Sequence, residues 1–227
     1  MKARPYLVIL LLACLSGCGS QGPGVGAVII HSESEFADAS KTALELTEAA
    51  LGKYDNGQQL EESDTKKLVE AIPYVMGLAG YRSNNPAPWV WRGQIAGALG
   101  DDAGAIDYFR TAVAIAPEKP GNDLVILLAE AHSKTADAII RLSTLPEVVK
   151  KAKESKIDPI KDAKNEVLTA VELRPKEPKY LCQLASMLIE ESKFDEAQEK
   201  LAEALLIEPE NPRAKALNKF LQEKRGS

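Results

Sequence analysis

The stretch PAPWVWRGQIAGALGDDAGAIDYFRTAVAIAP, residues 86–117, decides the fold, because it holds two short amphipathic helical patterns separated by a tight break. Trp89, Ile95 and Leu99 lie on the apolar stripe of the first pattern, and apolar residues recur at spacings of three and four in the second. Gly100 can adopt the left-handed turn that ends the first helix. The sequence therefore predicts a helical hairpin.

Small and large side chains in this hairpin occupy the positions that two closely packed helices require. Gly93 and Ala105 are small where the helices approach, which leaves room for Trp89 and Phe109 as large anchors. The pattern resembles the tetratricopeptide (TPR) repeat, a helix–turn–helix unit of 34 residues. The matching residues are Trp89, Gly93, Ala105, Phe109, Ala112 and Pro117, whereas Ala96 replaces the aromatic residue that the family usually has.

A second copy of the pattern indicates a repeat array. In residues 178–209 the small positions return as Ala185, Ala197 and Ala204. Proline ends this copy at position 209, and another proline precedes it by 34 residues, the period of the family. The intervening unit is longer by about 24 residues than that period allows, so we expect an insertion in it.

The resemblance implies an all-α fold, an α-solenoid of about three to four TPR-like hairpins with a C-terminal capping helix. The expected domain spans residues 32–227. Its expected parts are a degenerate N-terminal hairpin at 32–84, a repeat at 86–117, a repeat at 120–175 with an insertion near 133–160, a repeat at 178–209 and a capping helix at 212–224. In the first hairpin, Ser32 and Glu35 match a capping box, and we expect the helix that follows to end at Gly52.

The N-terminal residues are typical of an exported protein. Lys2 and Arg4 precede an apolar run too short to span a bilayer, and the run ends in LSGC, which resembles a bacterial lipobox. The resemblance implies a lipoprotein signal peptide at 1–17, acylation of Cys18 and a lipid-anchored flexible linker at 18–31. An ordinary secretory peptide that happens to end in Cys is the alternative. We expect the bacterial cell envelope in either case, and the outer membrane facing the periplasm if the organism has two membranes.

Charge and motif content argue against several functions. The chain has 28 basic and 33 acidic residues, a net charge of −5, which disfavours nucleic acid as a partner. His31 and His132 are the only histidines, and neither has a second ligand at metal-site spacing. Phosphate-binding glycine loops, GxSxG and HExxH are missing from the sequence. We therefore expect no enzyme, cofactor or metal. An enzymatic or ligand-binding envelope lipoprotein, with a site assembled from scattered residues, is the alternative.

Protein binding is the function that the resemblance implies. The first helix of each TPR repeat lines a concave groove that commonly receives a peptide or a helix. By register, the groove residues are Val90, Gln94, Gly97, Leu124, Leu128, Ala131, Lys179, Cys182, Ser186 and Ile189. This mostly apolar lining suits a protein or peptide with an apolar segment, while the lipid on Cys18 contacts the membrane. The N-terminal helices or the insertion could instead fill the groove, and the sequence leaves both arrangements open.

The expected role is that of a lipid-anchored TPR scaffold or adaptor in the envelope. Assembly of an envelope, pilus or secretion machine is the expected setting, by analogy with other lipoproteins of this kind.

Overall fold

The computed structural model describes residues 26–225, which form ten helices and no strand. The predicted all-α solenoid is confirmed. The helices are α2 (Glu33–Asp55), α3 (Glu62–Tyr81), α4 (Pro86–Ala98), α5 (Asp102–Ile115), α6 (Asn122–Ser143), α7 (Pro146–Ser155), α8 (Pro159–Leu173), α9 (Pro178–Glu190), α10 (Phe194–Ile207) and α11 (Pro212–Arg225). The signal peptide at 1–17, Cys18 and linker residues 18–25 lie outside the described residues and stay predictions.

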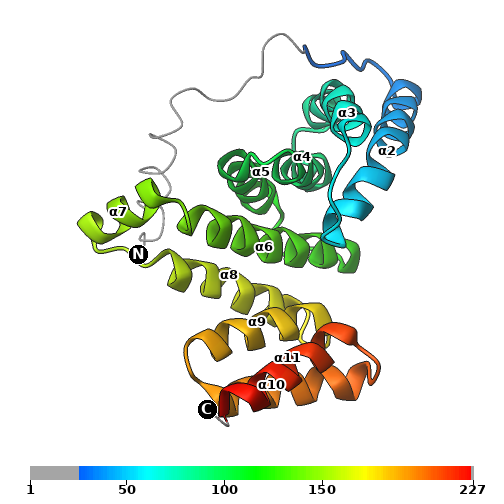
Figure 1. Cartoon of the computed structure of the whole chain (residues 1–227). Coiled ribbons are helices and arrows are strands. Elements are labelled where there is room, and N and C mark those ends of the chain that lie inside the picture. Colours follow the sequence, from blue (N-terminus) through cyan, green and yellow to red (C-terminus); the bar gives the residue numbers. More distant parts are fainter. Residues whose placement is uncertain (1–25, 226–227) are drawn as a thin grey trace.

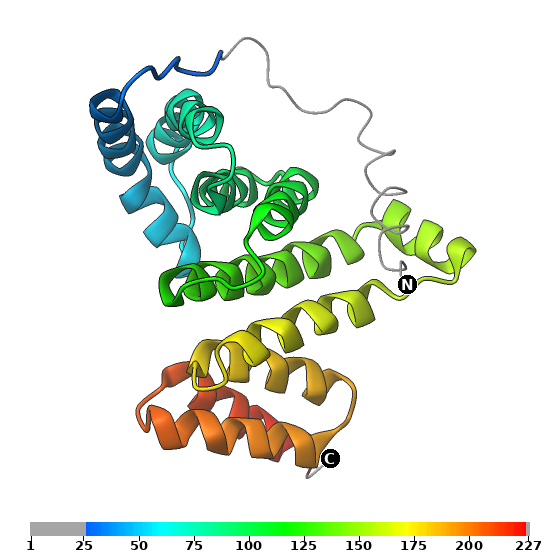
Figure 2. The ribbon, with the colours of Figure 1, turned by 180° about the vertical axis from the view of Figure 1, so that it is seen from behind.

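The described helices pair in chain order. Helix α2 packs on α3, α4 on α5, α6 on α8 and α9 on α10, and α11 covers the last pair. Figure 1 shows α3, α4 and α5 nearly end-on above the long helix α6, with α8 to α11 stacked below it, and Figure 2 shows the same order from behind. The chain therefore forms a curved stack in which each hairpin buries the apolar side of the one before it.

The α4–α5 hairpin has the geometry that its sequence predicts. A Cβ on Gly93 would lie 2.6 Å from Cε1 of Phe109, so only glycine permits this approach of the two helices. Gly100 has a φ of +82°, the left-handed conformation that ends a helix without strain only for glycine. Oδ1 of Asp101 accepts a hydrogen bond of 2.9 Å from the Gly104 amide and caps α5.

Helix α2 is longer than predicted, and its extension matters for the site. Ser32 caps it, accepting from the Glu35 amide at 3.2 Å, but the helix passes through Gly52 and ends at Asp55. The chain leaves the helical direction at Gly57, which has the left-handed φ of +67°. The prediction of an end at Gly52 was wrong because glycine at an exposed helical position lowers stability by only about 1 kcal/mol, which does not break a helix held by packing.

Residues 26–31, the described part of the predicted linker, have no regular secondary structure, but they are packed. The Val28 amide donates a hydrogen bond of 2.9 Å to the carbonyl oxygen of Pro73 in α3. A Cβ on Gly77 would collide with the Val28 carbonyl oxygen and lie 3.4 Å from Cδ1 of Ile30. The missing side chain of Gly77 therefore creates the space in which this segment lies.

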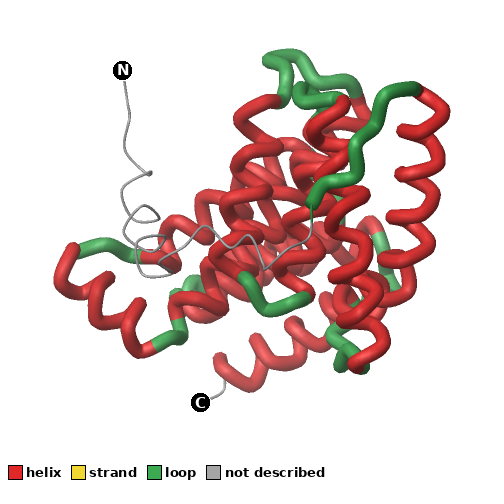
Figure 3. Tube along the Cα trace, turned by 90° about the horizontal axis from the view of Figure 1, so that it is seen from above, coloured by secondary structure: helices red, strands yellow, loops and turns green. Residues whose placement is uncertain are grey.

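The extra residues of the third hairpin form a projection. Helix α6 has 22 residues, whereas α4 and α9, the first helices of the two well-matched repeats, have 13 each. Helix α7 follows α6 and reaches out from the end of the α6–α8 pair (Figures 1 and 3). At the other end of the stack, α11 closes the core with Ala214 and Leu221, both fully buried.

Candidate protein-interaction surface

The structure places most of the predicted groove residues inside the solenoid. Those that are buried are Val90, Gly97, Leu128, Ala131, Cys182 and Ile189. Those that are partly exposed are Gln94, Leu124, Lys179 and Ser186. The buried members pack between helices and give the first helix of each repeat its place in the stack. A partner-binding role for the ten residues stays a prediction.

The C-terminal end of α2 covers the face shared by α4 and α6. Nε1 of Trp91 in α4 donates a hydrogen bond of 3.1 Å to Oγ1 of Thr47 in α2. A Cβ on Gly97 would lie 3.2 Å from the Tyr54 hydroxyl, and burial raises the pKa of that tyrosine. Asp55 pairs with Lys134 of α6. The N-terminal hairpin thus fills the groove at this point, one of the two arrangements that the sequence left open.

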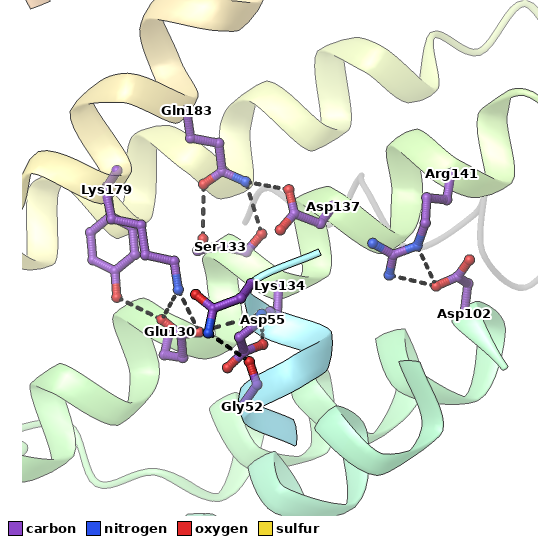
Figure 4. A network of polar contacts seen from close by, with 12 residues as sticks. Gly52, Asp55, Asp102, Glu130, Ser133, Lys134, Asp137, Arg141, Lys179 and Gln183 are labelled. Atoms are coloured by element: carbon purple, nitrogen blue, oxygen red, sulfur yellow. Dashed lines mark hydrogen bonds and ion pairs between the residues drawn. The ribbon is translucent and has the colours of Figure 1, made fainter. Parts of the chain in front are cut away.

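A polar seam follows α6 where it meets α2, α5 and α9, with Arg141 of α6 donating to Asp102 of α5 at 2.6 Å. We use this name for Glu130, Ser133, Lys134, Asp137 and Arg141 (Figure 4). Nζ of Lys179 in α9 lies 2.8 Å from both carboxylate oxygens of Glu130, and the Tyr180 hydroxyl donates to Glu130 at 3.2 Å. Burial, together with the neighbouring carboxylate, raises the pKa of Tyr180 well above its ordinary value. The phenol therefore stays protonated and remains a donor.

Gln183 of α9 is a second buried partner of the seam, beside Tyr180. Its Oε1 accepts from the Ser133 hydroxyl at 2.8 Å, and its Nε2 donates to Asp137 at 2.7 Å and to the Ser133 carbonyl oxygen at 3.1 Å. The seam is thus satisfied within the chain and fixes the angle between the third and fourth hairpins. Our apolar interpretation of the groove missed it. The signal was available, since charged residues recur along 130–141 at spacings of three and four.

An open apolar surface lies instead at the projection. A hollow of about 430 Å³ is lined by Ser143, Val149, Ala152, Lys153, Lys156, Ile157, Asp158, Pro159 and Ile160. Val149 and Ile160 keep 37% and 40% of their surface exposed. Leu145, at the start of α7, is 39% exposed. We call the nine lining residues, which do not include Leu145, the α7 hollow. Its apolar floor and two lysines can receive an apolar chain segment that carries a negative charge.

The described histidine of α6, His132, lies in a charged network between three helices. Nδ1 of His132 lies 2.6 Å from Oε2 of Glu166, and Nη2 of Arg110 lies 3.7 Å from the other oxygen of that carboxylate. This network joins α5, α6 and α8. Within residues 26–225 no group of His, Cys, Asp and Glu side chains could hold a metal ion, and none of the helices has the length and apolarity needed to cross a membrane. Cys182 is a free, buried thiol whose pKa burial raises.

Comparisons with known proteins agree with the repeat and the fold. Residues 87–119 match the tetratricopeptide repeat family, nearly the same span as the repeat predicted at 86–117. The protein Cut9–Hcn1, an APC/C hetero-tetramer, gives a structure match with a TM-score of 0.55 and 16% identity, over 83% of this chain and 32% of that one. A tetratricopeptide repeat protein from Parabacteroides merdae matches with a TM-score of 0.51 and 16% sequence identity. The match covers 82% of this chain and 61% of that one.

The chain spans about a third of the first of these structures and about three fifths of the second. At these identities the likeness shows the fold alone. No curated protein sequence matches the chain. The repeat match and the solenoid fold together support a TPR protein.

Proposed function

We propose that this TPR-type solenoid is a lipid-anchored scaffold of the bacterial envelope that holds a protein partner through an apolar segment. The TPR fold supports a protein–protein interaction scaffold in general. The anchoring, the envelope and a role in assembling an envelope, pilus or secretion machine are the finer parts of the proposal, and they rest on the lipobox-like residues that end at Cys18.

The α7 hollow is the observation from which we propose the kind of partner. The concave face is covered by α2 at Gly97, whereas the hollow is open and already formed. Covering the exposed parts of Val149 and Ile160 contributes about 1 kcal/mol each, and a negatively charged partner gains further from Lys153 and Lys156. An amphipathic helix with an acidic side fits this surface.

The contact of Val28 with α3 supports a short tether. The hydrogen bond to Pro73 fixes the chain ten residues after Cys18. Ten residues reach at most about 35 Å when fully extended. A lipid on Cys18 would therefore keep α3 and the N-terminal hairpin close to the membrane surface, within reach of membrane-bound partners.

Site-specific photo-crosslinking of the full chain in cells tests the choice of surface. A photoreactive residue at Val149 or Ile160 should capture the same protein. The matched control is Val69 of α3, which is 40% exposed and lies outside the hollow. The variant Val149→Asp should abolish capture from position 160, and Val69→Asp should leave it unchanged. Equal capture from all three positions, or none from the hollow, would contradict the proposal.

Metabolic labelling with a fatty-acid analogue tests the anchor separately. The native chain should incorporate the label and fractionate with membranes, and Cys18→Ser should do neither. Labelling that persists in Cys18→Ser would refute anchoring at this residue. Because the crosslinking reports on the hollow and the labelling reports on Cys18, one part can fail while the other holds.

A further inference from the structure

Arg92 of α4 is a buried cation for which the described residues supply no carboxylate. Only 9% of its surface is exposed, and its Nε lies fully buried without a hydrogen-bond partner. Its guanidinium faces an aromatic ring, since Cζ lies 4.6 Å from the ring centre of Tyr108 in α5. A buried guanidinium without an anion is costly, because water no longer solvates it and nothing replaces the lost hydrogen bonds.

A second unsatisfied donor lies one helical turn away. Nε1 of Trp89 is also buried without a partner, and the Trp89 ring stacks on Tyr108 with ring centres 6.3 Å apart. Trp89 and Arg92 are three residues apart and so share one face of α4. Both donors therefore gather at the same tyrosine ring. Trp89 lies at the end of the first turn of α4, where the helix dipole adds positive potential.

The same protein contains a completed version of this arrangement. Arg82 lies over the ring of Phe36 at 4.4 Å, and the ring of Phe36 packs against that of Tyr81 in a tilted arrangement with ring centres 5.6 Å apart. There a carboxylate fills the remaining place. Glu33 pairs with Nη2 of Arg82 and accepts from the Tyr81 hydroxyl at 3.2 Å.

Each site thus has an arginine over one ring of a packed aromatic pair. In the Arg82 site the carboxylate satisfies both the cation and the polar atom of the second ring. In the Arg92 site the second ring is Trp89, whose N–H is left without a partner. The Arg82 site lies at the surface and has a carboxylate, whereas the Arg92 site is buried and has none from the described residues.

We infer that Trp89, Arg92 and Tyr108 form a binding site for a carboxylate that the described part of the chain does not provide. A carboxylate has two oxygens and a negative charge, which match two unsatisfied N–H donors and one cation. Tyr108 forms the apolar wall that keeps the guanidinium in place. Both donors are buried, so the ligand reaches them when the partly exposed rings of Trp89 and Tyr108 move aside. The site differs from the α7 hollow and does not depend on it.

NMR of the ¹⁵N-labelled full chain in detergent tests the site. The chain has two tryptophans, and Nε1 of Trp91 already donates to Thr47, so its signal is an internal control. The probes are N-acetylglycine for a terminal carboxylate, N-acetylglutamate amide for an acidic side chain and N-acetylglutamine amide as the uncharged match. At constant ionic strength, one or both acids should shift the Trp89 indole and Arg92 Nε–H signals downfield to saturation. The signal of Trp91 should stay in place.

Substitutions make the test specific. Arg92→Gln should weaken acid binding about tenfold or more, the loss expected for a charge-assisted hydrogen bond. Arg82→Gln, which removes the other stacked arginine, should leave binding unchanged. Arg92→Lys keeps the charge and the aliphatic stem, and it should bind the acids more weakly than the native chain. This variant keeps the test valid if Arg92→Gln does not fold. The assignment would be overturned if the glutamine probe or chloride shifted the Trp89 and Arg92 signals as much as the acids do. It would also be overturned if the Trp91 signal moved equally, or if Arg92→Gln bound the acids as tightly as the native chain.

Discussion

Replacement of Gly93 by alanine tests the contact on which the best-preserved hairpin depends. The new Cβ would lie 2.6, 2.7 and 3.0 Å from Cε1, Cδ1 and Cζ of Phe109. Phe109 is only 2% exposed, so its ring has no open space to move into. Overpacking of this kind costs about 1–3 kcal/mol, whereas alanine gains about 1 kcal/mol over glycine in helix propensity. Because Phe109 has no room to move, the cost should lie in the upper half of that range, so we expect a net loss of about 1–2 kcal/mol in the free energy of unfolding.

Urea denaturation of the full chain followed by far-UV circular dichroism measures this loss, which corresponds to roughly 3–6 °C in Tm at this chain length. The matched control is Gly52→Ala in α2, where an added Cβ meets nothing within 4 Å. This control should be neutral or stabilising by up to about 1 kcal/mol.

A double-mutant cycle tests the specific contact. A smaller side chain in Phe109→Leu should relieve part of the clash, with a coupling of at least about 0.5 kcal/mol to Gly93→Ala. Native stability in Gly93→Ala, or losses that simply add in the cycle, would refute the close-packing argument.

Three further predictions concern other parts of the fold. The Lys53 ammonium and a backbone amide hold the pKa of the Asp64 carboxyl below its ordinary value. Ionised Asp64 therefore stabilises the fold above about pH 4, and this stabilisation is lost as the pH falls through the lowered pKa. Asp64→Asn and Lys53→Met should each flatten the decline of Tm between about pH 5 and 2, and an unchanged slope would exclude the pair as its source. Burial shields the Cys182 thiol and raises its pKa, so iodoacetamide at about pH 8 should alkylate it at least roughly tenfold more slowly in native buffer than in urea. Mass spectrometry of the peptide that contains Cys182 measures the two rates. Gly77→Ala should expel the segment around Val28, because the new Cβ would collide with the Val28 carbonyl oxygen. Hydrogen exchange at the Val28 amide should become faster while α3 stays folded, and unchanged protection of the Val28 amide would contradict the packing described.

The hairpin at 86–117 could be read from the sequence because its causes are local. Gly93 has no side chain where Phe109 approaches, Gly100 has the left-handed φ, and Asp101 caps the next helix. Such features depend on residues close in the chain, and a repeat reproduces them at a fixed interval. For the same reason the all-α class and the capping helix could be predicted.

The candidate sites could not be read in this way. The closure of the groove by Tyr54 and the pairing of Lys179 with Glu130 bring together residues from different hairpins. The lining of the α7 hollow lies within residues 143–160, but its shape depends on how α6, α7 and α8 meet. The extension of α2 beyond Gly52 also depends on packing, because local propensity favoured an earlier end.

The sequence by itself determined the repeat, the helix ends inside it and the lipobox-like N-terminus, since each is a pattern of neighbouring residues. Only the tertiary structure decided which surfaces are open and which polar groups are satisfied. Arg92 illustrates the difference. In the sequence it is one of 28 basic residues, and only the packing of α4 against α5 buries its guanidinium over Tyr108 without a carboxylate. Burial and hydrogen-bond satisfaction are properties of the packed chain, because they depend on what every other helix contributes to the same place.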